Sequence, residues 1–166
     1  MDYETLHDLY LRELKDLYSA EKQILRALPK ADRHARSPQL KQAIEKHTEQ
    51  TRMHIDRLED IFERLGKSPR GSKCKSIEGI IEEAEDWFDE EAMRDVMDAG
   101  IIAALQRVEH YEIAVYGCAR TYASLLHYTE DEGLLQETLT EEADTDKALT
   151  LLAKQINVQA REVHPR

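Results

Sequence analysis

The sequence has few of the residues that cross-link chains or interrupt helices: two cysteines, four prolines and six glycines in 166 residues. Cys74 and Cys118 are too few for a disulfide-rich scaffold and form no C-x-x-C pair, so we expect a reducing cytoplasm. The first residues lack the basic and apolar regions of a signal peptide. No apolar run approaches the roughly 20 residues of a membrane span, so we expect no membrane contact.

Positive charge is also scarce, because 23 Lys and Arg residues stand against 34 Asp and Glu residues, giving a formal net charge of -11. A nucleic-acid partner is not expected, since phosphate binding needs a basic face. The residues that do dominate are Leu, Ala, Glu, Lys and Arg, a composition typical of an all-α protein. The length fits a single domain over residues 1–166, with an ordered helical part at about 4–157 and a tail at 158–166.

Apolar residues at helical spacing predict four long helices, at about residues 5–28, 38–65, 91–127 and 135–156. Pro29 is expected to end the first helix and Gly66 the second. A polar turn at 129–133 is expected before the last helix.

A shorter amphipathic segment lies between the second and third predicted helices. Ser76 is its expected N-cap, and its apolar side chains run from Ile77 to Phe88. It is long enough to carry the chain back along the molecule, so that the third helix starts at the same end as the second. The sequence therefore predicts a four-helix bundle with one long crossover that holds a short extra helix.

The inward stripe of the third predicted helix contains two carboxylates. If Leu105 lies on the buried face, Glu109 and Glu112 point the same way, and no Lys or Arg shares that stripe. Ionised carboxylates are rarely buried without a positive partner, which makes a metal ion the natural candidate. The other predicted helices bring further ligand-type side chains to the same depth. The candidate metal ligands are Glu21, His54, Glu109, Glu112, Glu142 and Asp146.

The fourth predicted helix has an inward stripe that contains both of its candidate ligands. That stripe is Leu135, Leu139, Glu142, Asp146, Leu149, Ala153 and Ile156. Carboxylates with an imidazole suit two iron ions, or manganese, and the lack of thiolate disfavours structural zinc. A protonated, water-filled polar layer without metal is the alternative. The roles of His47 and Gln50 on the second helix, and of Tyr116 as packing residue or hydrogen-bond donor, stay open.

The set formed by Glu21, His54, the Glu109-x-x-Glu112 pair and Glu142 resembles the ferritin-like di-iron bundle as rubrerythrin displays it. Four longer runs resemble the YciE/YciF family of bacterial stress-associated ferritin-like proteins, and this resemblance covers about residues 4–157. These runs are Tyr18–Gln23, Ala27–Lys30, Gln106–Glu112 and Glu137–Glu142, and the spacing of His47, Thr51 and Arg57-Leu58 resembles that family as well.

The resemblance implies a cytoplasmic ferritin-like subunit, usually a homodimer, that is linked to stress responses and has no established reaction. Ferritin-like second and fourth helices usually each carry Glu-x-x-His, whereas this chain has Thr51-x-x-His54 and Glu142-x-x-Thr145. Gln50 and Asp146 are the substitutes that lie nearby. This departure makes metal binding a firmer expectation than catalysis.

Two functions follow from these expectations. The first is a di-iron stress-response protein that oxidises ferrous iron or consumes peroxide, with a redox partner. The second is a non-enzymatic stress or structural protein that acts through a protein partner and has a degenerate or purely stabilising metal site. Its contact surface would be the crossover helix or an exposed His110-Tyr111 pair. The sequence leaves open whether the protein is an enzyme.

Overall fold

The computed structural model describes residues 4–161, and every regular element in that range is an α-helix, as the composition predicts. The helices are α1 (Leu6–His34), α2 (Pro38–Arg64), α3 (Lys75–Phe88), α4 (Arg94–Leu125) and α5 (Thr129–Arg161). None of these helices has the length and apolar character needed to cross a membrane.

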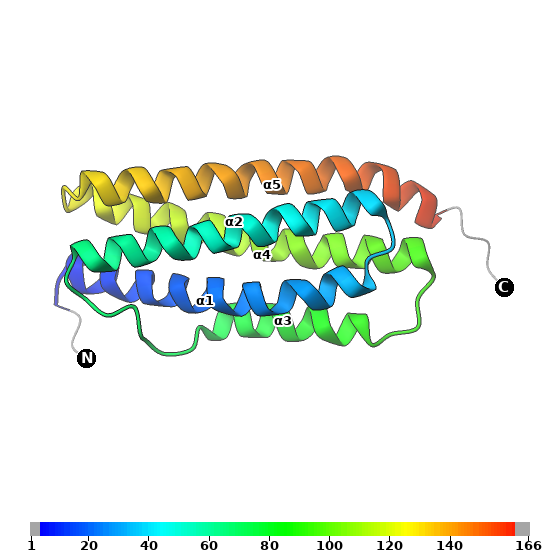
Figure 1. The fold of residues 1–166 in the computed structure, drawn as a ribbon, viewed down its shortest axis with the longest axis horizontal. Helices are drawn as coiled ribbons and strands as arrows, with labels where there is room; N and C mark the ends of the chain where they lie inside the picture. Colours follow the sequence, from blue (N-terminus) through cyan, green and yellow to red (C-terminus); the bar gives the residue numbers. More distant parts are fainter. Residues whose placement is uncertain (1–3, 162–166) are drawn as a thin grey trace.

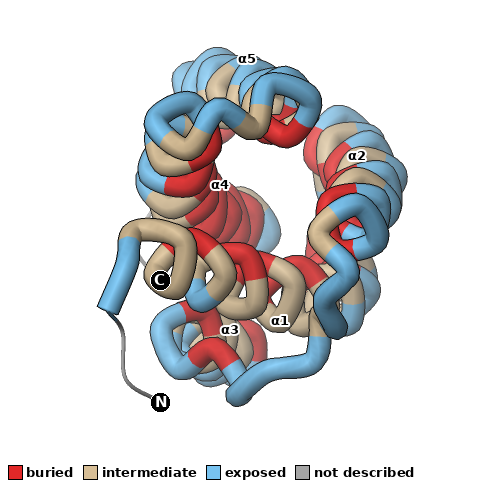
Figure 2. Tube along the Cα trace, turned by 90° about the vertical axis from the view of Figure 1, so that its left-hand side faces the viewer, coloured by how far each residue is buried: buried red, intermediate tan, exposed pale blue. Residues whose placement is uncertain are grey.

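The four long helices lie side by side around a shared interior (Figure 1). α1 and α5 each pack against both α2 and α4. The shorter α3 lies outside this group, against α1 and α4. An end-on view shows the buried residues facing inward from all four long helices (Figure 2).

The starts of α2 and α4 lie at the same end of the molecule, as the predicted crossover requires. The buried carboxylate of Asp98, near the start of α4, accepts hydrogen bonds from the backbone N–H groups of Arg36 at 2.8 Å and Ser37 at 2.7 Å. Ser37 is the N-cap of α2, and Pro38 occupies its first turn. Asp98 therefore satisfies donors that a helix start leaves unpaired.

The prediction that Pro29 ends the first helix is wrong, because α1 continues to His34 with Pro29 inside it. Pro29 is exposed. The backbone carbonyl that loses its usual donor there can therefore be hydrated. The extra turn places Ala31 in the core. Burial of that small apolar side chain continues the stripe past the proline.

Other helix boundaries also differ from the predictions. The N-cap of α3 is Cys74 rather than Ser76, and α4 is shorter at both ends than 91–127. α5 begins at Thr129, where a turn was predicted, because the chain reverses within three residues around His127 (φ 59°). Residues 158–161 of the predicted tail are helical, and 162–166 lie outside the described residues.

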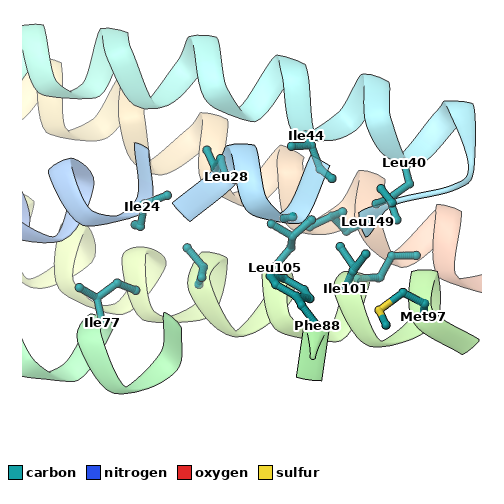
Figure 3. Packing of buried hydrophobic residues seen from close by; sticks show 14 of the residues in the cluster. Ile24, Leu28, Leu40, Ile44, Ile77, Phe88, Met97, Ile101, Leu105 and Leu149 are labelled. Carbon is teal, nitrogen blue, oxygen red and sulfur yellow. The ribbon is translucent and has the colours of Figure 1, made fainter. Parts of the chain in front are cut away.

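The interior consists of two apolar clusters separated along the helices by a polar layer. The first cluster joins side chains of all five helices, among them Ile24, Leu105 and Leu149 (Figure 3). The second cluster lies toward the other end and includes Leu14 and Phe62. These clusters fix the four long helices on both sides of the polar layer.

The outer helix α3 is anchored by its aromatic end. Phe88 is buried in the first apolar cluster. Trp87 lies against Gly100, where an added Cβ atom would come within 1.9 Å of the indole nitrogen. Only glycine leaves room for this contact, which therefore lets α3 pack closely against α4 at Gly100.

Candidate metal centre

The polar layer contains ligand-type side chains from all four long helices, each on the inward stripe of its helix. These side chains are at most 3% exposed. On each helix they occupy positions that apolar residues fill one or two turns away, so packing of the two apolar clusters holds them inside. The members with carboxylate or imidazole groups are Glu21, His47, His54, Glu109, Glu112 and Glu142.

Three of the predicted ligands form one compact group. Ligand atoms of Glu21, His54 and Glu142 lie within 4.8 Å of one another. The Nδ1 atom of His54 is 2.9 Å from Glu142 Oε1 and 3.3 Å from Glu21 Oε1. The hydroxyl of Tyr116 donates a hydrogen bond to Glu21 Oε1 at 2.5 Å. Tyr116 therefore contacts the group as a hydrogen-bond donor, in addition to packing.

A second group shares Glu142 with the first. Ligand atoms of His47, Glu109 and Glu142 also lie within 4.8 Å of one another. The Nδ1 atom of His47 is 2.6 Å from Glu109 Oε1. Two triads with a common carboxylate are an arrangement in which one side chain can bridge two cations.

Burial controls the protonation of this layer. It raises the pKa of Glu109 and Glu112, and the negative charge of Glu142 raises both further. Burial lowers the pKa of His47. Burial also opposes the charged form of His54, but contacts with Glu142 and Glu21 raise its pKa overall, to about 11. Without a cation, the layer therefore holds Glu109 and Glu112 as neutral acids beside a charged imidazolium.

Many polar atoms of the layer have no hydrogen-bond partner although they are buried. They include both carboxylate oxygens of Glu112, the Oε2 atoms of Glu21 and Glu109, and Nε2 of His47. Buried polar groups are normally paired, and leaving one unpaired costs about 1–3 kcal/mol. Converging carboxylate and imidazole groups that include such unpaired atoms fit a hard or borderline divalent cation.

The structure does not bring Asp146 to this layer. Its Oδ1 atom accepts a hydrogen bond from Gln106 at 3.0 Å and lies 3.2 Å from His110 Nε2. The side chain of Asp146 is 22% exposed. Gln50 is also engaged elsewhere, since its carbonyl accepts a hydrogen bond from Thr145 at 3.2 Å.

The residues that α5 buries differ on one side of the helix from the stripe predicted for it. Thr138 and Thr145 are buried there, whereas Leu139 and Asp146 are only half-buried. The expected exposure of the His110-Tyr111 pair is correct only for the histidine. Tyr111 is half-buried, and its hydroxyl lies 3.0 Å from the sulfur of Cys74.

Sequence reasoning missed the residues that hold His54 from outside. Its Nε2 atom lies 2.9 Å from Glu141 Oε2, and Glu141 accepts two hydrogen bonds from the guanidinium of Arg57. This guanidinium holds the pKa of Glu141 below its usual value. Arg57 occurs within a spacing that resembles the YciE/YciF family, but nothing in that spacing indicates its partner.

A protein-family model, described as a domain of unknown function (DUF892), matches residues 5–162 of the chain. The chain belongs to the DUF892 family. It is 43% identical to the protein YciF of Escherichia coli K12 over 154 residues, which is 92% of this chain and 93% of that protein. The resemblance to the YciE/YciF family is therefore confirmed.

Three solved structures have the same fold as this chain. The crystal structure of the E. coli stress protein YciF matches with a TM-score of 0.90 at 42% identity, covering 93% of this chain and 98% of that chain. YcfI from Rhodopseudomonas palustris matches with a TM-score of 0.87 at 40% identity, covering 90% and 95%. A Xanthomonas campestris protein at 20% identity shares the fold alone, with a TM-score of 0.75.

In this DUF892 chain, the departure from the usual Glu-x-x-His pairs is partly offset by His47. Position 145, which would carry the histidine of a Glu-x-x-His pair on the last helix, is a threonine. Its hydroxyl contacts the side-chain carbonyl of Gln50 and the backbone carbonyl of Glu141. His47 supplies an imidazole to the second group from a position two turns before His54. The layer therefore offers one imidazole to each group of ligands.

Proposed function

We propose that this protein is a ferritin-like, metal-binding stress protein. In this proposal the four long helices form the bundle, α3 lies in the crossover between the second and third of them, and the polar layer holds two divalent cations. The observation that carries the proposal is the convergence of buried carboxylate and imidazole groups, several of whose atoms have no hydrogen-bond partner. Cations would supply the positive charge that these atoms lack.

The two groups divide the ligands between two cation positions. Glu21 and His54 serve the first position, His47 and Glu109 the second, and Glu142 is shared by both. Glu112 is fully buried, interacts electrostatically with both groups and is the remaining candidate ligand. Iron is the first candidate and manganese the second, because both accept mixed carboxylate and imidazole ligands. Asp146 has no part in this set, since it faces His110.

Iron in this layer would supply one-electron redox chemistry, and the chain's own residues would control it. The apolar clusters on either side exclude water from the layer. Tyr116 holds Glu21 by its hydrogen bond and thereby fixes the orientation of that carboxylate. The reactions that would fit such a site are oxidation of ferrous iron, with dioxygen or peroxide as the electron acceptor, and reduction of peroxide with electrons from a partner protein.

The experiment that tests metal binding is elemental analysis of protein purified without chelators, followed by titration with Fe²⁺ under anaerobic conditions. We expect about two ions per chain for the wild type and fewer than one for a Glu112→Gln/Glu142→Gln double variant. Equal metal content in both proteins would contradict the proposed site. The matched control is Asp146→Asn, which keeps the wild-type content.

The enzymatic part of the proposal has its own test. Oxygen and peroxide consumption are measured on the iron-loaded wild type and on the double variant. Turnover that depends on Glu112 and Glu142 supports an oxidase or peroxidase. Absence of turnover in the iron-loaded wild type would contradict the enzymatic version while leaving metal binding intact.

A second candidate is a non-enzymatic structural role, in which metal only stabilises the bundle and a homodimer or protein partner carries the function in the cytoplasm. The provisional description of the R. palustris relative as a structural protein favours it. Sedimentation analysis and partner capture with the double variant distinguish the two candidates. Wild-type assembly and partner binding by that variant, with no turnover in the wild type, would favour the structural role.

A further inference from the structure

The polar layer is sealed from solvent, so any cation that binds there must cross one side of the bundle. Glu21, His54 and Glu142 are each at most 1% exposed. On the α1 and α4 side, α3 covers the bundle (Figure 2), and its apolar face packs into the first apolar cluster. α2 and α5 contact each other directly on the opposite side. A polar connection between the layer and solvent on this side must follow the contact between α2 and α5.

One chain of polar contacts crosses this side. Starting from His54 Nε2, it passes through Glu141 Oε2 at 2.9 Å to the guanidinium of Arg57, which donates to Glu141 at 2.7 and 3.1 Å. The same guanidinium donates to Glu137 Oε1 at 2.6 Å. We call Arg57, Glu137 and Glu141 the α2–α5 clasp.

Leaving the guanidinium aside, exposure increases outward along this chain. The side chain of His54 is 1% exposed, that of Glu141 25% and that of Glu137 57%. Arg57 lies between the two carboxylates with its side chain 13% exposed, and it also donates to the hydroxyl of Thr138 at 3.1 Å. The clasp thus reaches from solvent to a ligand of the layer, and a cationic group occupies its centre.

We propose that Arg57 is the gate through which divalent cations reach the polar layer. The inference rests on the proposed function and adds the entry route and the residue that controls it. With Arg57 in place, its positive charge repels an approaching cation, and its hydrogen bonds occupy the oxygens of Glu137 and Glu141. When the guanidinium moves away, two carboxylates become free for a hard cation directly beside His54.

A gate differs from a ligand or a positioning residue in its kinetic signature. Opening a gate speeds entry and exit together, so both rate constants rise while the dissociation constant changes little. A residue that only positions His54 would change the dissociation constant instead. The two rate constants therefore decide the role of Arg57 without any measurement of enzymatic activity.

The chain offers a matched control on the same two helices. Arg64 of α2 lies 2.9 Å from Asp131 of α5, so this pair also joins α2 to α5. Asp131 accepts a hydrogen bond from Tyr10 in the second apolar cluster rather than contacting the polar layer. Replacing Arg64 thus breaks an ion pair of the same kind without opening the clasp.

The experiment is stopped-flow binding of Co²⁺, whose visible absorbance changes when it is ligated, followed by its release to excess EDTA. We expect Arg57→Gln to raise the association and dissociation rate constants about tenfold, with the dissociation constant within about threefold of the wild type. Arg57→Lys, which keeps the charge but loses the two-pronged contact, gives an intermediate effect. Arg64→Gln binds and releases Co²⁺ at wild-type rates.

Wild-type rates in Arg57→Gln, or an equal acceleration in Arg64→Gln, would overturn the gate while leaving the metal centre intact. A wild-type protein that binds no Co²⁺ would overturn both the gate and the proposed function. If Arg57→Gln fails to fold by circular dichroism, Arg57→Lys replaces it, since it keeps the positive charge of the clasp. Its association and dissociation rate constants are both expected to rise about two- to threefold, and wild-type rates in this variant would overturn the proposal.

Discussion

The apolar clusters and the polar layer between them belong to the same helix faces, yet their contributions to folding are opposite. On α1, Leu14, Leu17 and Glu21 follow one another along one face, and all three are fully buried. Burial of each leucine contributes about 1.5–3 kcal/mol to folding. Burial of an unpaired carboxylate costs free energy, either directly or by forcing the group to take up a proton.

The apolar clusters therefore stabilise a fold whose polar layer, taken alone, would oppose folding. The two clusters fix the helices from both ends, so the carboxylates cannot move out to solvent without unpacking the core. The residues that stabilise the fold and the residues that could bind metal thus lie at different positions along the helices. Substitutions in the clusters and in the layer should therefore have separable effects on stability.

The largest effect is expected in the first apolar cluster. Ile101 is fully buried there, and Ile101→Ala leaves a cavity that should lower the free energy of unfolding by about 2–5 kcal/mol. The loss should be the same with and without Mn²⁺, because Ile101 lies outside the polar layer. Denaturant unfolding under both conditions measures it. A loss of stability that appears only with Mn²⁺ would show that the first apolar cluster and the polar layer do not contribute independently.

A somewhat smaller effect is expected in the layer itself and only when metal is present. At a hundredfold excess of free Mn²⁺ over its dissociation constant, binding at one of the two positions should stabilise the wild type by about 2.7 kcal/mol. Glu112→Gln should remove most of that gain and leave the metal-free protein at least as stable as the wild type. Thermal unfolding with and without Mn²⁺ gives both values. Full metal stabilisation of the variant would exclude Glu112 as a ligand.

The pH dependence of the metal-free protein should show which groups hold protons in the layer. The pKa of Glu109 and Glu112 is raised in the folded state, so their stabilising contribution is complete at low pH and is lost as pH rises. Between pH 7 and 10, the stability of the metal-free protein should therefore fall.

The matched comparison for this pH effect is the Glu112→Gln variant, whose amide does not titrate. Its stability should fall less steeply than that of the wild type over the same range, measured by urea unfolding at each pH. Parallel curves for the two proteins would show that Glu112 is not protonated in the folded layer.

The smallest effect is expected for Asp146, which lies beside the layer on α5 but faces Gln106 and His110. Asp146→Asn should change the free energy of unfolding by no more than about 0.5 kcal/mol. Its Mn²⁺ affinity, measured by titration calorimetry, should stay within about twofold of the wild type. A large loss of affinity would return Asp146 to the ligand set.

The stripes of α1, α2 and α4 could be predicted from the sequence because their apolar residues are closely spaced and strongly periodic. Glu21, His54, Glu109 and Glu112 are all buried, as their positions on those stripes predict. The stripe of α5 was harder to place, since Thr138 and Thr145 are weakly apolar and give little signal. The sequence therefore predicts an inward Asp146, whereas the buried residue is its neighbour Thr145.

Helix ends and outer contacts could not be predicted in the same way. The fate of the helix at Pro29 depends on whether its missing hydrogen bond faces water, which is a property of the assembled bundle. The contact of Arg57 with Glu141 joins residues 84 positions apart, and no local pattern indicates such a pair. The sequence does not assign a role to His47, because an inward histidine can be a hydrogen-bonded core residue as well as a metal ligand.

The most direct test of the metal centre is anomalous X-ray diffraction from crystals of the protein loaded with Mn²⁺. We expect two anomalous peaks in the polar layer. One should lie among Glu21, His54 and Glu142, and the other among His47, Glu109 and Glu142. Peaks confined to the surface, such as beside Asp146 and His110, or no peaks at all in crystals shown to contain manganese, would contradict it.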